Sequence, residues 1–457
     1  MSWSRSTRSR KQIDNLDRIS NLPDNVIDCI LSKLPIQDAI DTSLLSKTWQ
    51  DKWMLSTSSL VFDDLDIHFS GSCDHHYGDD DDDCKYCFTK FVNSALFLHH
   101  GPINRFVVRA QTITSRKKLR KWITHLSMKH VEDFQLVLGV THKDHELPPR
   151  FYTFHHLTRL ELRNLVMPNL PPDFDGFKSL TTMDLNSVEI ASRSLERLIF
   201  LCPQLKTLKL IYVSLDYLCI NAPKLESFEF IGSFKSAWFE STPSLVMLCV
   251  RLYDGVLPEA RWVHSTYNRC IDLDQNMEFL SGIHTFDAGM QFLKFLVAAS
   301  PPKQVPAATL NSLVRLQLSR FKLHDLAAVE TALFLIRSSP NLQFLKVSLR
   351  RSHGRDNPSS TPVVQFLEEA KCSLSLPKLS QAMLQWFSGT EPEMELLKII
   401  LACSPWLQEM AIVPDIPSLK GEGSILKALL CLPRASVLAE IKYSESMTEM
   451  RRYHLQF

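Results

Sequence analysis

The sequence lacks the features that would direct it into or across a membrane. No apolar run reaches the roughly 18 residues that a membrane-spanning helix needs. The N-terminal stretch MSWSRSTRSRKQ is basic and polar, and no apolar core of a signal peptide follows it. The 11 cysteines are an odd number and most lie inside apolar segments, which favours buried thiols over a disulfide framework. We therefore expect a protein of the cytoplasm, the nucleus or both, without a membrane partner.

An excess of charge of one sign is also missing. Lys and Arg number 51 against 50 Asp and Glu, which gives a formal net charge of +1. A dedicated nucleic-acid binder would gather basic charge on one face of the molecule. We therefore expect no nucleic-acid partner.

Recognisable catalytic motifs are absent as well. The sequence contains no GxSxG, GxxxxGK[ST], HExxH or GxGxxG pattern. We therefore expect a chain that is not an enzyme and binds no cofactor. An enzyme site concealed in the irregular segment 251–300 is kept as an alternative.

The first part of the chain is rich in short helical patterns. Residues 1–16 are predicted to be a disordered basic tail. Pro23 suits the first turn of a helix. The helical pattern that begins after Pro23 ends at Pro35. A second short helix is expected after Pro35, and a third could carry Leu44 and Trp53. About 40 residues with this many large apolar side chains cannot bury them all internally. The helices therefore either dock a partner or cap the core of the following domain.

The residue pattern of this segment points to a known module. Leu22-Pro23, Ile27, Ile30-Leu31, Leu34-Pro35, the stretch 43–46 and Trp49 together resemble the F-box of plant F-box proteins over the whole motif. We assign the F-box to residues 17–56. The resemblance implies a Skp-type adaptor as partner and, through it, a cullin. It places these residues at the adaptor interface or in its supporting core: Leu22, Pro23, Ile27, Ile30, Leu31, Leu34, Pro35, Leu45 and Trp49.

A short template repeats along the rest of the chain. It has large apolar residues at its first, fourth and sixth positions and recurs mostly every 20–29 residues, the spacing of leucine-rich repeats. Eight clear copies begin at Leu157, Leu180, Leu205, Leu225, Leu245, Leu313, Leu342 and Leu407. Weaker copies begin at Ile103, Val131, Ile283 and Leu379. One such unit cannot bury its apolar face alone, but a stack of them makes a continuous core.

The segments between the copies indicate the fold class. Five copies follow a small residue and a proline, and proline pushes its predecessor out of helical geometry. The stretches SLERLIFL, AAVETALFLIR and EMELLKIILA ahead of three copies have helical patterns. We therefore predict an α/β protein: a small all-α F-box cluster followed by a curved solenoid over residues 101–370. Short parallel strands would line its concave face and helices its convex face. Residues 57–100 are predicted to be a linker with an acidic Cys/His insertion.

The C-terminal part resembles the FBD segment that follows leucine-rich repeats in plant F-box proteins. The resemblance includes the turn Pro433-Arg434-Ala435-Ser436. We assign residues 371–457 to this region, which would continue and cap the solenoid. F-box, repeats and FBD together cover nearly the whole chain, so the sequence is identified as a member of the plant F-box/FBD/leucine-rich-repeat family.

A target would bind the concave face. Side chains that alternate with the core positions of each strand point to that face. It would present the following polar residues: Arg159, Glu161, Arg163, Asp184, Asn186, Lys209, Glu229, Arg251, Arg315, Gln317 and Lys346. Because both signs of charge are interspersed, this surface suits a protein or peptide better than a polyanion. The alternative for any single one of these residues is a merely solvated position.

Two other clusters were weighed as ligand sites. Cys73, His75, His76, Cys84 and Cys87 include a Cys-x-x-Cys pair, but one such pair beside five consecutive Asp favours a solvated acidic loop over zinc. The basic run of residues 115–122 favours a solvated surface over an anion site. We predict no metal site and leave open whether a small ligand or an inositol phosphate binds.

The residues and the resemblance together predict a function. We expect a substrate-recognition subunit of a cullin-RING (SCF-type) ubiquitin ligase, with the F-box on the adaptor and the repeats and FBD region on a target protein. The alternative is a leucine-rich-repeat scaffold or inhibitor without a role in ubiquitin transfer.

Overall fold

The computed structural model describes residues 19–20, 22–65, 82–111, 116–139, 145–253, 278–299, 310–350, 361–371, 374–415 and 422–443. The chain divides into two compact units, residues 1–142 and 143–457. Within these described ranges, no helix combines the length and the apolar character needed to cross a membrane.

The first unit begins with short helices. They are α1 (Asp24–Leu31), α2 (Ile36–Asp41), the 3₁₀ turn η1 (Thr42–Leu44) and α3 (Trp53–Ser56). Pro23 and Pro35 stand directly before α1 and α2, as the sequence predicted. The expected third helix over Leu44–Trp53 does not form as one element. Most of the residues between η1 and α3 form turns.

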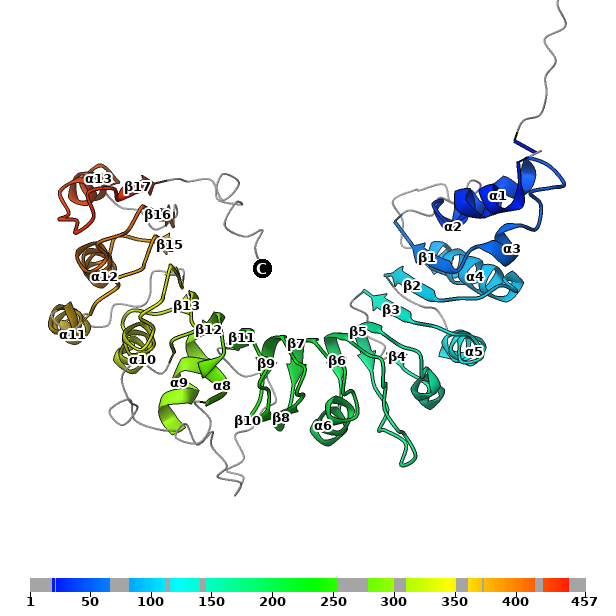
Figure 1. Cartoon of the computed structure of the whole chain (residues 1–457), viewed down its shortest axis with the longest axis horizontal. Helices are drawn as coiled ribbons and strands as arrows, with labels where there is room; N and C mark the ends of the chain where they lie inside the picture. Colours follow the sequence, from blue (N-terminus) through cyan, green and yellow to red (C-terminus); the bar gives the residue numbers. More distant parts are fainter. Residues whose placement is uncertain are drawn as a thin grey trace, which may run out of the picture. The chain divides into compact units, whose positions relative to one another are not determined.

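Three parallel strands and two longer helices complete the first unit. The strands β1 (Ser59–Asp63), β2 (Arg105–Ala110) and β3 (Asp133–Leu138) pair in this order. The helices α4 (Asp82–Leu98) and α5 (Arg116–Leu126) lie beside them (Figure 1). The segment 57–100, expected to be a linker, therefore contributes a strand and a helix. Its apolar Leu60 and Phe62 alternate along β1 and are fully buried.

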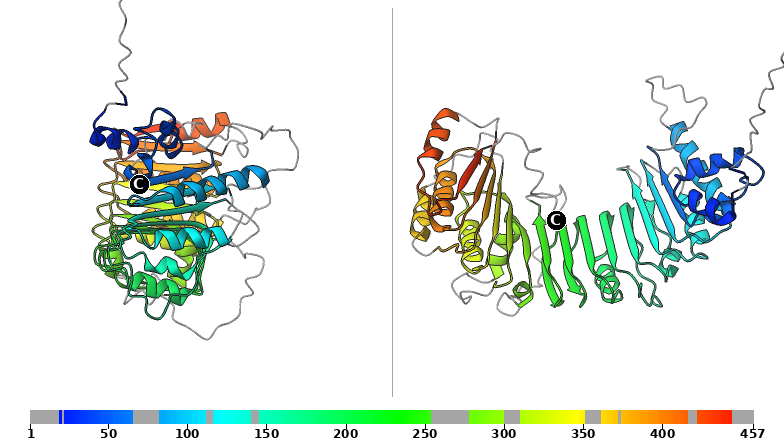
Figure 2. Two further views of the ribbon diagram at one scale, coloured as in Figure 1. Left: turned by 90° about the vertical axis from the view of Figure 1, so that its right-hand side faces the viewer. Right: turned by 45° about the horizontal axis from the view of Figure 1, so that its top comes forward.

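The second unit is a leucine-rich-repeat solenoid. Its main sheet is parallel throughout and runs in chain order (Figure 1; Figure 2, right). The strands are β4 (His145–Glu146), β5 (Arg159–Val166), β6 (Thr182–Glu189), β7 (Thr207–Ser214), β9 (Ser227–Ser233), β11 (Met247–Leu252), β12 (Thr285–Gly289), β13 (Arg315–Phe321), β14 (Phe344–Leu349), β15 (Gln381–Phe387), β16 (Glu409–Pro414) and β17 (Glu440–Tyr443). A 3₁₀ turn, η2 (Pro149–Thr153), lies between β4 and β5. Each of the eight clear copies of the template contributes one strand.

Helices cover one side of this sheet. They are α6 (Ser192–Phe200), α8 (Glu278–Ser281), α9 (Met290–Ala299), α10 (Leu326–Arg337), α11 (Thr361–Lys371), α12 (Glu391–Cys403) and α13 (Glu422–Leu430) (Figure 1). The three helices expected from sequence, α6, α10 and α12, are all present. The opposite side of the sheet of the second unit is called the open face below.

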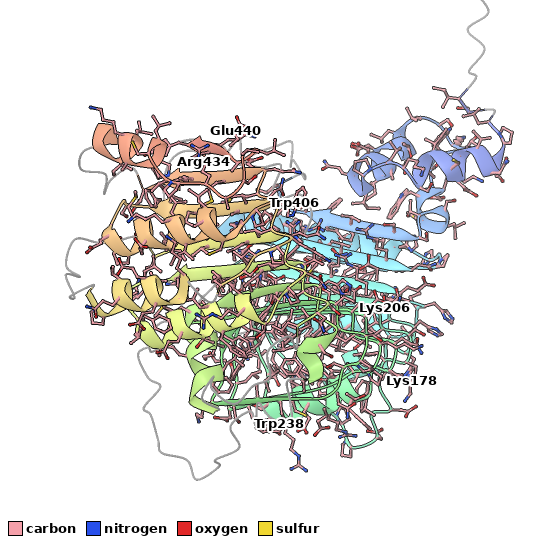
Figure 3. All side chains as sticks on the ribbon, turned by 60° about the vertical axis from the view of Figure 1, so that its left-hand side comes forward. Lys178, Lys206, Trp238, Trp406, Arg434 and Glu440 are labelled. Carbon is pink, nitrogen blue, oxygen red and sulfur yellow. The ribbon has the colours of Figure 1, made fainter. Side chains whose placement is uncertain are left out.

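Two repeats have strands in place of helices on the outer side. The strands β8 (Tyr217–Asn221) and β10 (Ser236–Ser241) pair with each other in a separate two-stranded sheet. Their aromatic and branched residues favour the extended chain. Tyr217 and Trp238 stack with their ring centroids 5.4 Å apart. Trp238 is labelled in Figure 3, well away from Arg434 and Glu440 near the C-terminal end of the unit.

A backbone bulge recurs where the strands end. Asn164, Ser187, Tyr212, Arg320 and Trp386 each lie two residues after the second core position of their strand and have φ between 52° and 63°. This left-handed conformation is strained for residues other than glycine. It turns the next side chain back into the core, where these five residues are buried: Leu165, Val188, Val213, Phe321 and Phe387.

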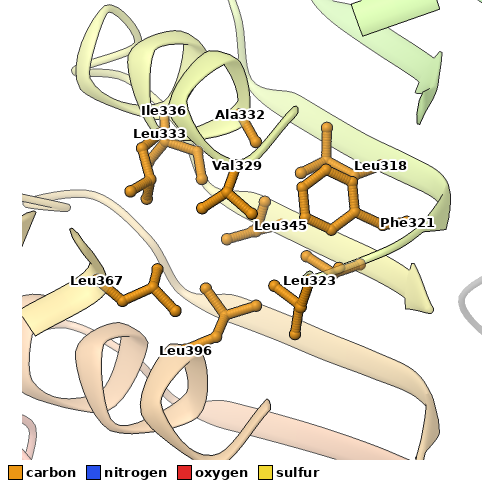
Figure 4. Close-up of a pocket in the computed structure, with 11 residues that line it drawn as sticks. Leu318, Phe321, Leu323, Val329, Ala332, Leu333, Ile336, Leu345, Leu367 and Leu396 are labelled. Carbon is orange, nitrogen blue, oxygen red and sulfur yellow. The ribbon is translucent and has the colours of Figure 1, made fainter. Parts of the chain in front are cut away.

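One packing defect in the core of the second unit is apolar. A cavity of about 20 Å³ lies between α10, α11, α12 and the strands β13 and β14 (Figure 4). Its walls include Leu318, Phe321, Leu333, Leu345 and Leu396. A space of this size holds at most about one water molecule, and it offers no polar partner. It is a core defect and not a ligand site.

Candidate interaction surfaces

Helix α1 presents two apolar stripes, only one of which is buried. Ile27 and Leu31 are fully buried in the helix cluster, while Val26 and Ile30 are exposed on the neighbouring stripe. The polar side of α1 is fixed to the region of α3. Lys52 Nζ lies 2.7 Å from Asp24, and the hydroxyl of Ser56 donates to Asp28. The remaining side of α1 therefore carries apolar surface that the cluster does not use.

The turn η1 and the residue that follows it add two leucines to the exposed apolar side chains. Leu44 is 88% exposed and Leu45 is 58% exposed. Exposed leucines scattered singly are common, but four large apolar residues within one small cluster indicate a protein interface. Val26, Ile30, Leu44 and Leu45 are called the exposed apolar set below.

The nine residues predicted to serve adaptor binding fall into three groups. Ile27, Leu31 and Trp49 are core residues, and the indole nitrogen of Trp49 donates to the Ile19 carbonyl at 3.2 Å. The half-buried residues are Leu22 and Leu34, and the exposed ones are Pro23, Ile30, Pro35 and Leu45. The prediction omitted Val26 and Leu44. Two features of the sequence could have indicated them. Val26 lies four residues before Ile30, and Leu44 is next to Leu45.

The helix cluster is also fastened to the strands and helices that follow it in the first unit. The amides of His100 and Gly101 both donate to the Met54 carbonyl at 2.9 Å. Any Cβ at Gly101 would lie 2.3 Å from the Leu55 carbonyl oxygen, so the close approach requires glycine. His99 is fully buried beside Trp53, and burial lowers its pKa to about 4. Capping and partner docking are therefore compatible roles for these helices.

The predicted target-facing residues all lie on strands of the second unit. They alternate with core leucines and their equivalents, so their side chains belong to the open face. In the middle row of that face, Glu161, Asp184, Lys209 and Glu229 follow one another in register. The row continues through Cys249, Asp287, Gln317 and Lys346.

The half of the open face formed by β5 to β9 is charged and solvated. Arg159 lies 3.3 Å from Glu161, and Lys209 lies 3.4 Å from Glu229. Burial and the neighbouring Glu161 raise the pKa of Asp184. Arg163 and Asn186 add polar groups, and the residues of this half are exposed or half-buried. Ion pairs of this kind contribute little to stability, but they give this half a surface of mixed charge.

The half formed by β11 to β14 buries its charges. Asp287 is buried, forms an ion pair with Arg251 and accepts a hydrogen bond from the Ser319 hydroxyl at 2.7 Å. Gln317, also buried, donates to that hydroxyl at 3.2 Å. Lys346 is 4% exposed, and burial lowers its pKa. Asp287 was missed from sequence because it lies in one of the weak copies of the template.

Arg315 joins this half of the open face from the adjacent row. Its guanidinium carbon lies 4.2 Å from the centroid of the Phe344 ring, a cation–π contact. Burial lowers the pKa of Arg315. Next along the sheet, Met383, Ala411 and Val413 form a buried apolar cluster on the open-face positions of β15 and β16.

The two clusters weighed as ligand sites are only partly described. Cys73, His75 and His76 lie outside the described residues, and the backbone of Cys84 and Cys87 belongs to α4. Among the described residues, no group of three or more His, Cys, Asp or Glu side chains could hold a metal ion. The basic run lies mostly on α5, where Leu119 and Trp122 are buried and the basic side chains are mostly exposed.

The C-terminal turn fastens the last strand to the solenoid. The hydroxyl of Ser436 is buried and donates to the Leu407 carbonyl at 2.7 Å while accepting from the Leu438 amide at 3.2 Å. The guanidinium of Arg434 donates to the Ala439 carbonyl at 2.7 Å, and the Ala435 amide donates to the Leu401 carbonyl at 3.0 Å. These bonds give the Pro-Arg-Ala-Ser pattern a structural reason.

A short helical cluster with exposed leucines ahead of a parallel-strand solenoid defines a leucine-rich-repeat protein with an N-terminal interaction module. The family model "FBD-associated F-box protein At5g56370, LRR repeats" matches residues 119–347, half of the chain, and the F-box domain model matches residues 19–57. The chain belongs to the plant family of F-box/FBD/LRR-repeat proteins. The matched models describe an F-box and repeats, and nothing in these comparisons shows an enzymatic domain.

Similar proteins from Arabidopsis thaliana match along nearly their whole length. F-box/FBD/LRR-repeat protein At1g13570 is 29% identical over 432 residues, covering 93% of this chain and 98% of that protein. F-box/FBD/LRR-repeat protein At5g56420 is 26% identical over 444 residues, covering 93% and 99%. The solved structure of Leptospira interrogans LRR protein LIC12759 aligns with 12% identity and a TM-score of 0.31, too low to add to the argument.

Proposed function

We propose that the chain is the substrate-recognition subunit of a cullin-RING (SCF-type) ubiquitin ligase. The F-box binds a Skp-type adaptor and, through it, a cullin, while the repeats and the FBD region bind the target protein. The chain performs no chemistry itself. It raises the local concentration of the target beside the charged carrier enzyme, which is catalysis by proximity. The buried free thiols of Cys202 and Cys219 suit the reducing cytoplasm or nucleus.

The observation that carries the proposal is the exposed apolar set on the F-box. Burying a leucine that is otherwise exposed contributes about 1.5–3 kcal/mol. Leu44 and Leu45 lie outside the helix core, so the fold of the first unit does not depend on contacts of their side chains. A partner that covers them gains this free energy without rearranging the cluster.

Co-purification with a plant Skp-type adaptor tests the proposal. The double variant Leu44→Asp, Leu45→Asp should fold normally because both sites are exposed. Burying two carboxylates at an interface costs several kcal/mol, so adaptor binding should weaken by more than about 100-fold. Met128→Asp is the matched control, because Met128 is 68% exposed in the same unit but outside the F-box.

The two outcomes separate the candidate functions. Binding by the parent chain and the Met128 variant, lost in the double variant, supports the receptor function. Absence of binding by the parent chain, or equal binding by all three proteins, contradicts it and favours a scaffold or inhibitor.

A further inference from the structure

Each repeat of the second unit has one residue directly before its first core position, just ahead of the strand. We call these residues the rim row. In the repeats of β7, β9, β11, β13, β14 and β15 the rim-row residue is polar: Gln204, Lys224, Ser244, Ser312, Asn341 and Lys378. Neighbouring members of the row bond to each other, since Lys224 donates to Gln204 at 2.7 Å and Lys378 donates to Asn341 at 2.8 Å.

The rim row becomes apolar in the last two repeats. Trp406 is the rim-row residue of the β16 repeat and is 68% exposed. In the β17 repeat the rim-row residue is Leu438, also 68% exposed, and the side chain of Val437 beside it is fully exposed. Polar residues serve this position in the earlier repeats, so the fold does not require apolar ones here. Exposed apolar side chains that include a tryptophan indicate a protein interface.

Trp406, Val437 and Leu438 belong to one surface and are called the apolar rim patch below. The Ser436 hydroxyl donates to the Leu407 carbonyl at 2.7 Å, which fastens the segment before β17 to the segment before β16. The two segments therefore lie at about the 4.8 Å spacing of neighbouring strands. Trp406 is labelled in Figure 3, in the C-terminal part of the unit.

Two cations flank the apolar rim patch. Lys378 is the rim-row residue one repeat before Trp406, and its side chain is exposed. On the other side, Arg434 donates to the Ala439 carbonyl at 2.7 Å, which places its guanidinium group beside Leu438. Within the residues that the structure describes, neither Lys378 nor Arg434 forms an ion pair with a carboxylate.

The carboxylates closest along the chain are engaged by another cation. Lys442 Nζ lies 3.2 Å from Glu409 and 3.8 Å from Glu440, at the start of β16 and β17. The positive charge of Lys378 and Arg434 is therefore available to a partner. A surface that combines exposed apolar side chains with flanking cations is complementary to an apolar side chain flanked by acidic ones.

The charges also distinguish between possible occupants. A second copy of the chain, placed symmetrically on the apolar rim patch, would bring the same two cations together, and like charges repel. Residues 444–457 contain two Glu and two Arg, so this segment has no excess of negative charge to offer. A partner protein with acidic residues satisfies both the apolar and the charged part of the surface.

We propose that the apolar rim patch binds a segment of a partner protein in which a large apolar side chain packs on Trp406 and Leu438, while Asp or Glu side chains pair with Lys378 and Arg434. The inference goes beyond the proposed function and does not rest on it. The patch lies in the second unit, away from the F-box, and its residues precede the strands instead of belonging to the open face.

The test uses the full chain and a library of random short peptides displayed on phage. Selected peptides are synthesised with a C-terminal amide, so that a selected acid is a side chain. The first variant is Trp406→Ser, which installs a residue that the rim row has in other repeats. Phe200→Ser is its matched control, because Phe200 is 63% exposed in the same unit. The second variant is Lys378→Met, with Lys224→Met of the same row as its control.

The expected result has three parts. One family of selected peptides carries a large apolar residue with Asp or Glu within three positions. Its affinity falls at least about tenfold in the Trp406 variant and at least about threefold in the Lys378 variant, and it stays within about twofold in both controls. The Trp406 variant melts within about 1 °C of the parent chain because the side chain is mostly exposed, so the loss of binding is not unfolding.

The inference is overturned if no selected family depends on Trp406, or if the dependent family carries no acidic residue. Two further measurements identify a different occupant and overturn it as well. A parent chain that sediments as a dimer, beside a monomeric Trp406→Ser variant, identifies a second copy. Peptide affinity at least about tenfold higher for a chain that ends at Tyr443 identifies residues 444–457.

Discussion

Replacing Asp287 by asparagine removes the carboxylate that forms the ion pair with Arg251 on the β11 to β14 half of the open face. Asparagine has nearly the same shape and can still accept from the Ser319 hydroxyl, but it carries no charge. Arg251 then loses its ion-pair partner in a position where only about a third of its side chain is exposed. Lys346 and Arg251 also lose the attraction of the carboxylate.

The magnitude follows from the burial of the pair. Breaking a buried ion pair by removing one partner costs about 3–5 kcal/mol, and the partial exposure of Arg251 places this case near about 3 kcal/mol. Unfolding entropy of about 2.1 cal/mol/K per residue gives about 0.7 kcal/mol/K for a unit of this length. Asp287→Asn should therefore lower the melting temperature of the second unit by about 4–5 °C.

Thermal unfolding followed by circular dichroism measures this shift. Glu229→Gln is the matched control, because it makes the same carboxylate-to-amide change in the same row of the open face. Its partner Lys209 is 42% exposed, so the shift should be about 1 °C or less. Adding Arg251→Met to Asp287→Asn should recover at least about 1 kcal/mol, since the unpaired cation is then gone.

The reasoning is refuted if Asp287→Asn and Glu229→Gln shift the melting temperature equally. It is also refuted if the added Arg251→Met change makes the Asp287 variant less stable. Either outcome would mean that the charged side chains of β11 to β14 are as solvated as those of β5 to β9.

Two further predictions concern the F-box junction and the C-terminal turn. Burial lowers the pKa of His99 to about 4 from 6.5, so the neutral ring stabilises the fold above about pH 6.5. Up to about 3 kcal/mol of this contribution is lost as the pH falls from 6.5 through 4. The melting temperature of the His99→Leu variant should therefore drop less between about pH 7.5 and 4.5 than that of the parent chain. An equal drop in the two proteins would exclude His99 as the cause. Ser436→Ala leaves the Leu407 carbonyl and the Leu438 amide without their partner, at a cost of about 2 kcal/mol. Amide hydrogen exchange in β17 should accelerate about 30-fold, and less than about threefold would mean that the turn does not hold this strand.

The strands could be predicted from the sequence because each copy of the template buries two residues that alternate along the chain. Leu160 and Leu162 show the pattern plainly, and even the weak copy at Ile283 corresponds to a strand. The outer strands β8 and β10 were not predicted, because the template describes only the inner strand of each repeat. Residues 57–100 were assigned to a linker because the strand β1 precedes the first recognised copy.

The candidate site was less accessible to sequence reasoning. The F-box pattern does not tell which of two neighbouring isoleucines is exposed, yet Ile27 is buried and Ile30 is not. Arg251 and Lys346 could be placed on the open face by alternation along their strands. Their burial could not be predicted, because it depends on side chains such as Asp287 that come from other repeats.

The outer strands β8 and β10 have a consequence for how repeats of this kind can vary the curvature of their sheet. The inner strands that flank them start at Thr207, Ser227 and Met247, so these repeats are only 20 residues long. Repeats with outer helices are longer, and a helix about 10 Å wide spreads the outer side more than strands spaced about 4.8 Å apart. Repeat length therefore sets the local bend of the sheet. An insertion on the outer side can change the curvature of the open face without altering any residue on that face.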